Sequence, residues 1–205
     1  VGVGEGNTIA FNGGDGVNAA TGTNNAFRGN VITGNGNLGI DLGANGVQAN
    51  DPNDVDTGAN QLQNYPVLAA ATGSAGSVQI TGALHSRAGS TYVIDFYANY
   101  ACDPSANGEG QQYLGAATVN SDAAGNAPID ATLTATLAGR FVTATATDSF
   151  GNTSEFSPAL VIQDCDPGRQ GVCPQAEDAV PNGGPGRSLN ARGATGSTSC
   201  IQESP

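Results

Sequence analysis

The sequence predicts an all-β protein with three parts, and one observation points to each part. Residues 7–42 contain a repeat with an offset of 23 residues, residues 67–163 contain short strands of alternating apolar and polar residues, and residues 164–205 hold three of the four cysteines. We therefore expect three parts. Residues 1–66 would form the last coils of a right-handed parallel β-helix and an acidic capping loop, residues 67–163 an immunoglobulin-like antiparallel β-sandwich, and residues 164–205 an irregular, disulfide-stapled tail.

The repeat pairs residues of the same type across each offset. Five pairs match: Asn7 with Asn30, Ile9 with Ile32, Asn12 with Asn35, Gly16 with Gly39, and Val17 with Ile40. A period in the twenties, with strands too short to be stable alone, is typical of a solenoid whose coils bury one another by stacking. The apolar pairs should point inward about 4.8 Å apart, which is the spacing of neighbouring strands. The paired asparagines should form a structural ladder of side-chain amides at the turns.

Two coils are few for a solenoid, because each coil is stabilised mainly by its neighbours. We expect the open edge of the first coil to be covered by an upstream segment, by another domain or by a neighbouring subunit. The start at Val1, with neither an initiator methionine nor a signal peptide, indicates a processed chain.

Residues 50–58 are the most acidic short stretch and are predicted to form a loop. Asp51, Asn53, Asp54 and Asp56 could supply side-chain oxygens to Ca²⁺, a cation that prefers oxygen ligands. The alternative is a solvated loop that caps the coil, because Asp-Pro and Asn-Asp pairs are also common turn formers. The spacing is not that of an EF-hand loop, since no Glu closes it. Calcium is thus the one cofactor that the sequence suggests.

Asp148, Asn152 and Glu155 form a second, weaker candidate for a cation site. The structural interpretation is favoured here. In that interpretation Asp148 and Asn152 bond to the backbone of a turn, and Phe156 fills the interior of the sandwich.

Strands of period two follow after Val67. They are expected around Val78 and Ile80, and over residues 92–100, 113–119, 127–137, 141–148 and 159–163. Turns of Gly, Asn and Asp separate them, with no helical stretch between, which favours an antiparallel sandwich. The expected core of the sandwich consists of Ile94, Phe96, Leu114, Leu133, Val142, Ala144 and Ile162.

Several of these runs resemble large secreted bacterial surface proteins, in which a parallel β-helix is followed by a sandwich domain. The runs that carry the resemblance are residues 38–43, 50–52, 60–68, 95–99, 102–104, 108–110, 114–115, 145–148 and 151–157. The most specific is Gly151-Asn152-Thr153-Ser154-Glu155-Phe156-Ser157. The resemblance covers about residues 7–163 and implies an exported, repeat-containing surface protein. It implies no catalytic residues.

The tail has few apolar residues, a composition that is typical of disorder. Because it cannot form a core of its own, we expect cross-links or a neighbouring copy to order it. Disulfides are the first candidate: Cys165 with Cys173 would close a local loop, and Cys102 with Cys200 would staple the tail to the sandwich. Four cysteines allow three connectivities, which the sequence does not distinguish. Zinc is a poor alternative, because the spacing is wrong and no His lies nearby. The second candidate is a neighbouring copy, against which the tail would pack as an added strand.

The composition limits the classes of partner. A formal net charge of −12 makes binding to nucleic acid unfavourable, and no apolar run is long enough to span a membrane. An even number of cysteines in an acidic chain favours an oxidising, extracellular or cell-surface location. The only histidine is His85, so neither a Ser-His-Asp nor a Cys-His mechanism has support.

We expect a non-catalytic extracellular structural protein. The first hypothesis is a self-assembling filament or surface-layer-type subunit, a homopolymer built by head-to-tail contacts in which neighbours cover the open coil and order the tail. The alternative is a C-terminal stalk or adhesion fragment of a larger surface protein that binds glycan or a host surface. A polysaccharide-degrading β-helix enzyme ranks last, because the coils offer such a site only Arg28, Asp15 and Asp41.

Overall fold

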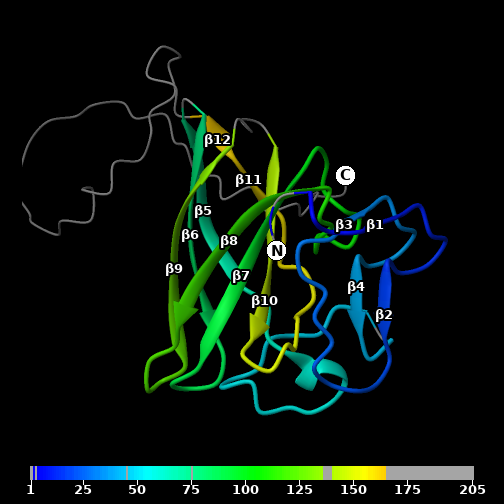
Figure 1. The fold of residues 1–205 in the computed structure, drawn as a ribbon, viewed down its shortest axis with the longest axis vertical. Helices are drawn as coiled ribbons and strands as arrows, with labels where there is room; N and C mark the ends of the chain where they lie inside the picture. Colours follow the sequence, from blue (N-terminus) through cyan, green and yellow to red (C-terminus); the bar gives the residue numbers. More distant parts are fainter. Residues whose placement is uncertain (1, 3, 45, 75, 136–139, 165–205) are drawn as a thin grey trace, which may run out of the picture.

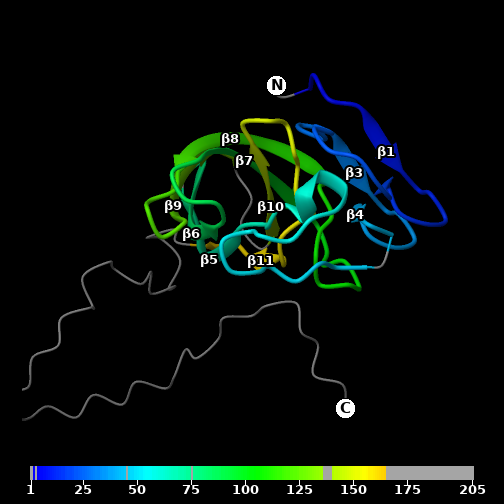
Figure 2. The ribbon, with the colours of Figure 1, turned by 90° about the horizontal axis from the view of Figure 1, so that it is seen from below.

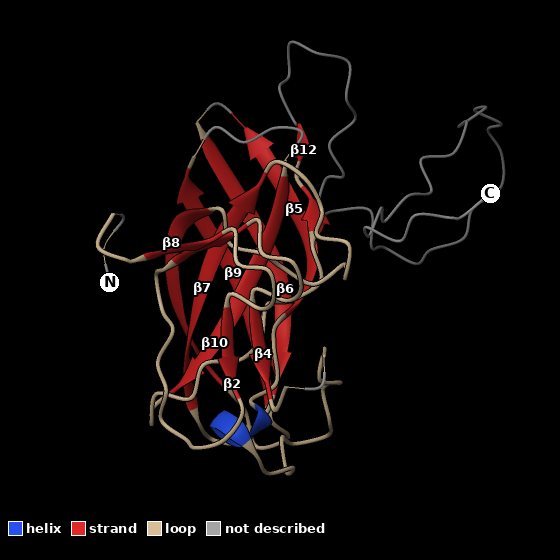
Figure 3. Ribbon diagram, turned by 90° about the vertical axis from the view of Figure 1, so that its right-hand side faces the viewer, coloured by secondary structure: helices blue, strands red, loops and turns tan. Residues whose placement is uncertain are grey.

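The computed structural model describes residues 2, 4–44, 46–74, 76–135 and 140–164 (Figure 1). The predicted all-β class is confirmed, because the described residues form twelve strands and a single short helix, a 3₁₀ turn at Ala59–Leu62 (η1) (Figure 3). The predicted tail pairings of Cys165, Cys173 and Cys200 lie outside the described residues.

The two sequence repeats form short parallel strand pairs. The strands are β1 (Thr8–Ala10), β2 (Val17–Ala19), β3 (Val31–Thr33) and β4 (Ile40–Leu42). β1 pairs with β3 and β2 pairs with β4, both in parallel. Ile9 lies opposite Ile32 and Val17 opposite Ile40, so the predicted register of 23 residues is confirmed.

The asparagine ladder is also confirmed. The backbone N–H and Nδ2 of Asn12 donate to Oδ1 of Asn35, at 3.1 and 2.8 Å. The same two groups of Asn7 donate to Oδ1 of Asn30, at 2.9 and 3.1 Å. Asn7 and Asn12 thus each join the first repeat to the second through two hydrogen bonds that lie outside the β-strands.

Two four-stranded sheets form the rest of the described fold (Figures 1 and 2). Their strands are β5 (Val67–Ser74), β6 (Ser77–His85), β7 (Thr91–Asn99), β8 (Gln112–Asn120), β9 (Asn126–Thr134), β10 (Phe141–Asp148), β11 (Leu160–Val161) and β12 (Gln163–Asp164). One sheet has the order β11-β10-β7-β8 and the other β12-β5-β6-β9. All pairs are antiparallel except β12 with β5. The sequence did not predict β5, whose Ala, Thr and Gly residues lack the alternation of large apolar side chains.

The core between the two sheets contains the residues that the sequence predicted. Six of them are buried, namely Ile94, Phe96, Leu114, Val142, Ala144 and Ile162, while Leu133 is half-buried against the same cluster. Alternate residues of β7 and β10 supply this core, as period two requires.

Most of the intervening residues of β7 and β10 are buried as well, because the repeats cover the second face of this sheet. Tyr97 of β7 packs with Ile32, Ile40, Leu42 and Phe156 in a separate apolar cluster. In Figure 2 the repeat strands lie beside β10, on the side of the molecule opposite β9. The expectation that Phe156 fills the sandwich was wrong: its ring meets Tyr97 edge-on at a centroid distance of 5.2 Å, in the junction between repeats and sandwich.

Candidate functional site

Glu109 closes the asparagine ladder at the sandwich end of the repeats. Asn35 donates from its backbone N–H and from Nδ2 to Oε1 of Glu109, at 3.2 and 2.7 Å. These are the same two donors that Asn12 directs at Asn35 one repeat earlier. Oε2 of Glu109 also accepts from the N–H of Gly34. The Glu109 carboxylate therefore occupies the place of a third ladder asparagine.

Gly110 completes the same edge through its backbone. Ile32 donates to the carbonyl of Gly110 at 2.9 Å, and Gly110 donates back to the carbonyl of Ile32 at 2.8 Å. A Cβ at Gly110 would stand 2.8 Å from Cζ of Phe156 and 2.9 Å from Cδ1 of Tyr97. Only glycine fits without displacing these rings, so the close approach of the sandwich loop to β3 depends on it.

The Glu155 carboxylate accepts hydrogen bonds at the edge of β4, as Glu109 does beside β3. Its Oε1 accepts from the N–H of Leu42 and its Oε2 from the N–H of Gln48, both at 2.9 Å. The side chain is buried, and burial raises the pKa of Glu155 to about 7 despite these two donors, with the negative charges of Asp41 and Asp15 adding to the increase.

Asn60 forms a further ladder step, which the sequence did not predict. The N–H and Nδ2 of Asn25 donate to its Oδ1, at 3.0 and 3.1 Å, and its own Nδ2 donates to the carbonyl of Thr153 at 3.0 Å. Asn60 follows Asn25 by 35 residues rather than 23, because the acidic loop lies between them. No search at the repeat offset would therefore find it.

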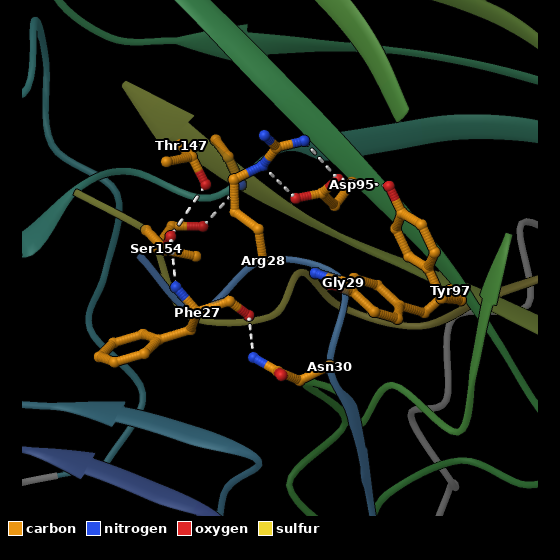
Figure 4. Close-up of polar contacts among 11 residues, drawn as sticks. Phe27, Arg28, Gly29, Asn30, Asp95, Tyr97, Thr147 and Ser154 are labelled. Carbon is orange, nitrogen blue, oxygen red and sulfur yellow. Dashed lines mark hydrogen bonds and ion pairs between the residues drawn. The ribbon is translucent and has the colours of Figure 1, made fainter. Parts of the chain in front are cut away.

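A buried ion pair fastens the repeats to the sandwich (Figure 4). Arg28 donates from Nε to Oδ2 and from a terminal nitrogen to Oδ1 of Asp95, at 2.8 and 3.0 Å. Asp95 is fully buried and also accepts from the hydroxyl of Tyr113 at 2.9 Å. Burial of the phenol, followed by the negative charge of Asp95 and the hydrogen bond to it, raises the pKa of Tyr113 to about 12, and the hydrogen bond to Asp95 raises the pKa of Arg28. The one arginine that the repeats offered to an active site thus holds the junction together.

The adjoining residue strengthens the same contact. Gly29 donates its N–H to the hydroxyl of Tyr97 at 3.1 Å, and Figure 4 shows the two side by side below the ion pair. Burial raises the pKa of Tyr97. The hydroxyl therefore stays neutral and serves as a hydrogen-bond acceptor for the repeat.

The acidic loop brings three of its four predicted ligands together. One carboxylate oxygen each from Asp51, Asp54 and Asp56 lies within 4.8 Å of the others. Asp54 is buried and accepts from the N–H of Asn64 at 3.0 Å and from Oγ of Ser86 at 2.7 Å. Asn53 is exposed, and its Oδ1 stands 3.2 Å from the position of a Cβ on Gly125, in the turn between β8 and β9.

Two oxygens of this cluster are buried without a hydrogen-bond partner among the described residues, namely Oδ1 of Asp51 and Oδ1 of Asp56. Burial, followed by the charges of the neighbouring carboxylates, raises the pKa of Asp56, and burial raises that of Asp54. Oxygens at these separations can share one cation, since two ligands on opposite sides of Ca²⁺ are about 5 Å apart. The three aspartates can therefore hold a metal ion.

The weaker candidate site around Asp148 has a structural role. Oδ1 of Asp148 accepts from the N–H groups of Phe150 and Asn152, at 2.8 and 2.9 Å. Oδ1 of Asn152 accepts from the N–H of Asn24 at 2.7 Å. Asp148 thus shapes the turn, Asn152 links it to the repeats, and Glu155 binds β4 instead.

Comparison with known proteins gives no assignment. No protein-family model matches the chain, and no curated protein is significantly similar to it. Within the part of the chain that the structure describes, no helix has the length and hydrophobicity to cross a membrane. The resemblance to secreted surface proteins therefore stays an expectation.

Proposed function

We propose that this chain is a non-catalytic, extracellular structural module. In this proposal residues 1–66 form the last coils of a right-handed parallel β-helix and an acidic capping loop, and an immunoglobulin-like sandwich closes the end of the coils. The observation that carries it is that Glu109, Gly110 and Glu155 occupy hydrogen-bonding groups of the second repeat with which a further coil would otherwise pair. The sandwich thus both terminates the coils and provides the surface on which they pack.

The closed end favours the stalk or adhesion fragment over the filament. A head-to-tail homopolymer needs two complementary free surfaces, one at each end of the coils. Residues of the same chain already occupy the end next to the sandwich. We therefore propose a stalk or adhesion fragment of a surface protein, in which the coils and the sandwich form one continuous body.

Two further observations fit this proposal. Cys102, in the loop after β7, takes part in a disulfide bond, which favours an oxidising compartment. A groove of about 600 Å³ is lined by polar residues, among them Asp15, Asn18, Asn37 and Asp41, and by the apolar Leu38, Ala44 and Pro104. Carboxylates and amides of this kind can accept and donate hydrogen bonds to sugar hydroxyls, so a neutral glycan is the partner that we assign to this face.

We propose Ca²⁺ as the cation of the acidic loop. Asp51 and Asp56 each have a buried oxygen that lacks a hydrogen-bond partner among the described residues, and one oxygen of each lies within 4.8 Å of one on Asp54; hard oxygen ligands suit this ion. Bound Ca²⁺ would fix the loop that joins the coils to β5, so its role would be structural.

The closing role of the sandwich is tested by Glu109→Gln. An amide retains one acceptor but directs an N–H at a backbone donor, so the coils should lose protection from hydrogen exchange while the sandwich keeps it. Asp130→Asn is the matched control, because Asp130 is exposed and, among the described residues, accepts one hydrogen bond, from Gln79. Equal protection of β3 in both variants would contradict the proposal.

Electron microscopy and sedimentation of the untreated chain distinguish the stalk from the filament. We expect single, monodisperse particles. Regular filaments with a subunit-length repeat would refute the stalk and favour the homopolymer.

A further inference from the structure

The side-chain ladder of the repeats has a direction. At each step the N–H and Nδ2 of one asparagine donate to a side-chain oxygen of the next residue toward the sandwich. Asn12 donates to Asn35, and Asn35 donates to Glu109. The steps from Asn7 to Asn30 and from Asn25 to Asn60 have the same direction.

The outer edge of the first repeat therefore presents acceptors only from its ladder side chains. Among the described residues, Oδ1 of Asn7, of Asn12 and of Asn25 accepts no hydrogen bond. The amides cannot rotate to offer donors instead, because each Nδ2 is already bonded to the next residue of its ladder.

The backbone of this edge is open in the same way. β1 pairs only with β3 in the described structure. In the second repeat, the N–H of Val31 and the carbonyl of Thr33 form hydrogen bonds to the first repeat, whereas the N–H and the carbonyl of Ile32 form hydrogen bonds to Gly110. By the repeat, Thr8 and Ala10 correspond to Val31 and Thr33, so their N–H and C=O groups point outward.

The apolar side chains show the same difference between the two repeats. Ile32 and Ile40 are 1% exposed, whereas their counterparts Ile9 and Val17 are only half-buried. A further layer over the first repeat would bury this apolar row, as the first repeat buries that of the second.

We propose that the outer edge of the first repeat binds a further β-coil that carries the same asparagine pattern. The strands of that coil would pair with β1 and β2, and its asparagines would donate to Oδ1 of Asn7 and Asn12. A second copy of this chain docked edge to edge would instead set acceptor against acceptor. The inference rests on the proposed function and extends the interface already present between the two repeats.

The test extends the full chain by one coil. A second copy of residues 7–29 is inserted before Asn7, which preserves the 23-residue register and keeps a glycine in the position of Gly6, where a Cβ would stand 1.9 Å from the carbonyl oxygen of Gly29. The matched control has aspartate in the inserted copy at the two places that correspond to Asn7 and Asn12. Carboxylates there face the acceptors of the original first repeat.

Hydrogen exchange at the amides of the original Thr8 and Ala10 gives the result. We expect rapid exchange in the unmodified chain, exchange at least about tenfold slower with the asparagine copy, and little slowing with the aspartate copy. Equal slowing in both insertions, or no slowing in either, would overturn the proposal. So would slow exchange in the unmodified chain together with a dimer in sedimentation. None of these outcomes affects the closing role of Glu109, which its own variant tests.

Discussion

Asp95→Asn should weaken the junction between the repeats and the sandwich more than any surface substitution. The carboxylate is fully buried and accepts three hydrogen bonds, two from Arg28 and one from Tyr113. An amide of the same shape has one acceptor oxygen and directs its N–H groups at the other donors. The substitution therefore leaves the Arg28 charge without its counterion.

The expected cost follows from the exposure of the two partners. Removing one partner of a fully buried ion pair costs about 3–5 kcal/mol. The Arg28 side chain is 24% exposed, so water still solvates part of its charge. We therefore expect the free energy of unfolding to fall by about 2–3 kcal/mol. For a chain of this length that loss lowers Tm by about 4–12 °C.

Thermal and urea unfolding of Asp95→Asn, Arg28→Gln and the double variant measure this effect. The double variant removes both charges, so its loss should be smaller than the sum of the single losses by about 1 kcal/mol or more. Asp130→Asn should stay within about 0.5 kcal/mol of the unmodified chain. A loss for Asp95→Asn as small as that of the control, or additive losses, would refute a structural ion pair.

Three further perturbations test the junction and the acidic loop. The pKa of Glu155 is raised from 4.5 to about 7 on folding, so the folded chain binds more protons between these values; stability should fall as pH rises through this range, by about 3 kcal/mol at most. Urea unfolding against pH should show a flatter profile for Glu155→Gln, and an unchanged profile would contradict the assignment. Gly110→Ala should destabilise by about 1–3 kcal/mol because its Cβ meets buried rings, whereas Gly13→Ala, with open space around its Cβ, should cost about 1 kcal/mol or less in chemical denaturation. Millimolar Ca²⁺ should raise Tm in differential scanning calorimetry, more than Mg²⁺ does, and Asp56→Asn should reduce the shift; equal shifts in both proteins would count against the site.

The parts of the fold that obey a local period could be predicted from the sequence. The offset between Asn12 and Asn35 gave the correct register of β1 with β3, since one-residue slips would turn Ile9 outward. Alternation in β7 predicted Ile94 and Phe96 in the core, and the acidic spacing predicted the cluster at Asp51, Asp54 and Asp56.

The contacts between distant segments could not be predicted in this way. Glu109 follows Asn35 by 74 residues and replaces an asparagine by a different side chain, so no periodicity points to it. The alternating Thr and Ala residues of β10 suggest one buried and one solvated face, yet Thr143, Thr145 and Thr147 are buried under the repeats. Phe156 was misplaced for the same reason, because the second face of this sheet is covered only in the assembled fold.

The junction also has a mechanical consequence. A pulling force on the repeats would reach the sandwich by more than one route. One route is the peptide chain between η1 and β5. The Arg28–Asp95 ion pair and the carboxylates of Glu109 and Glu155, which bind the repeats from separate segments of the chain, would also carry part of this force. Since these attachments lie in parallel, the load on each is a fraction of the whole, and the junction yields only when several fail together. A module loaded in this way transmits tension as one piece.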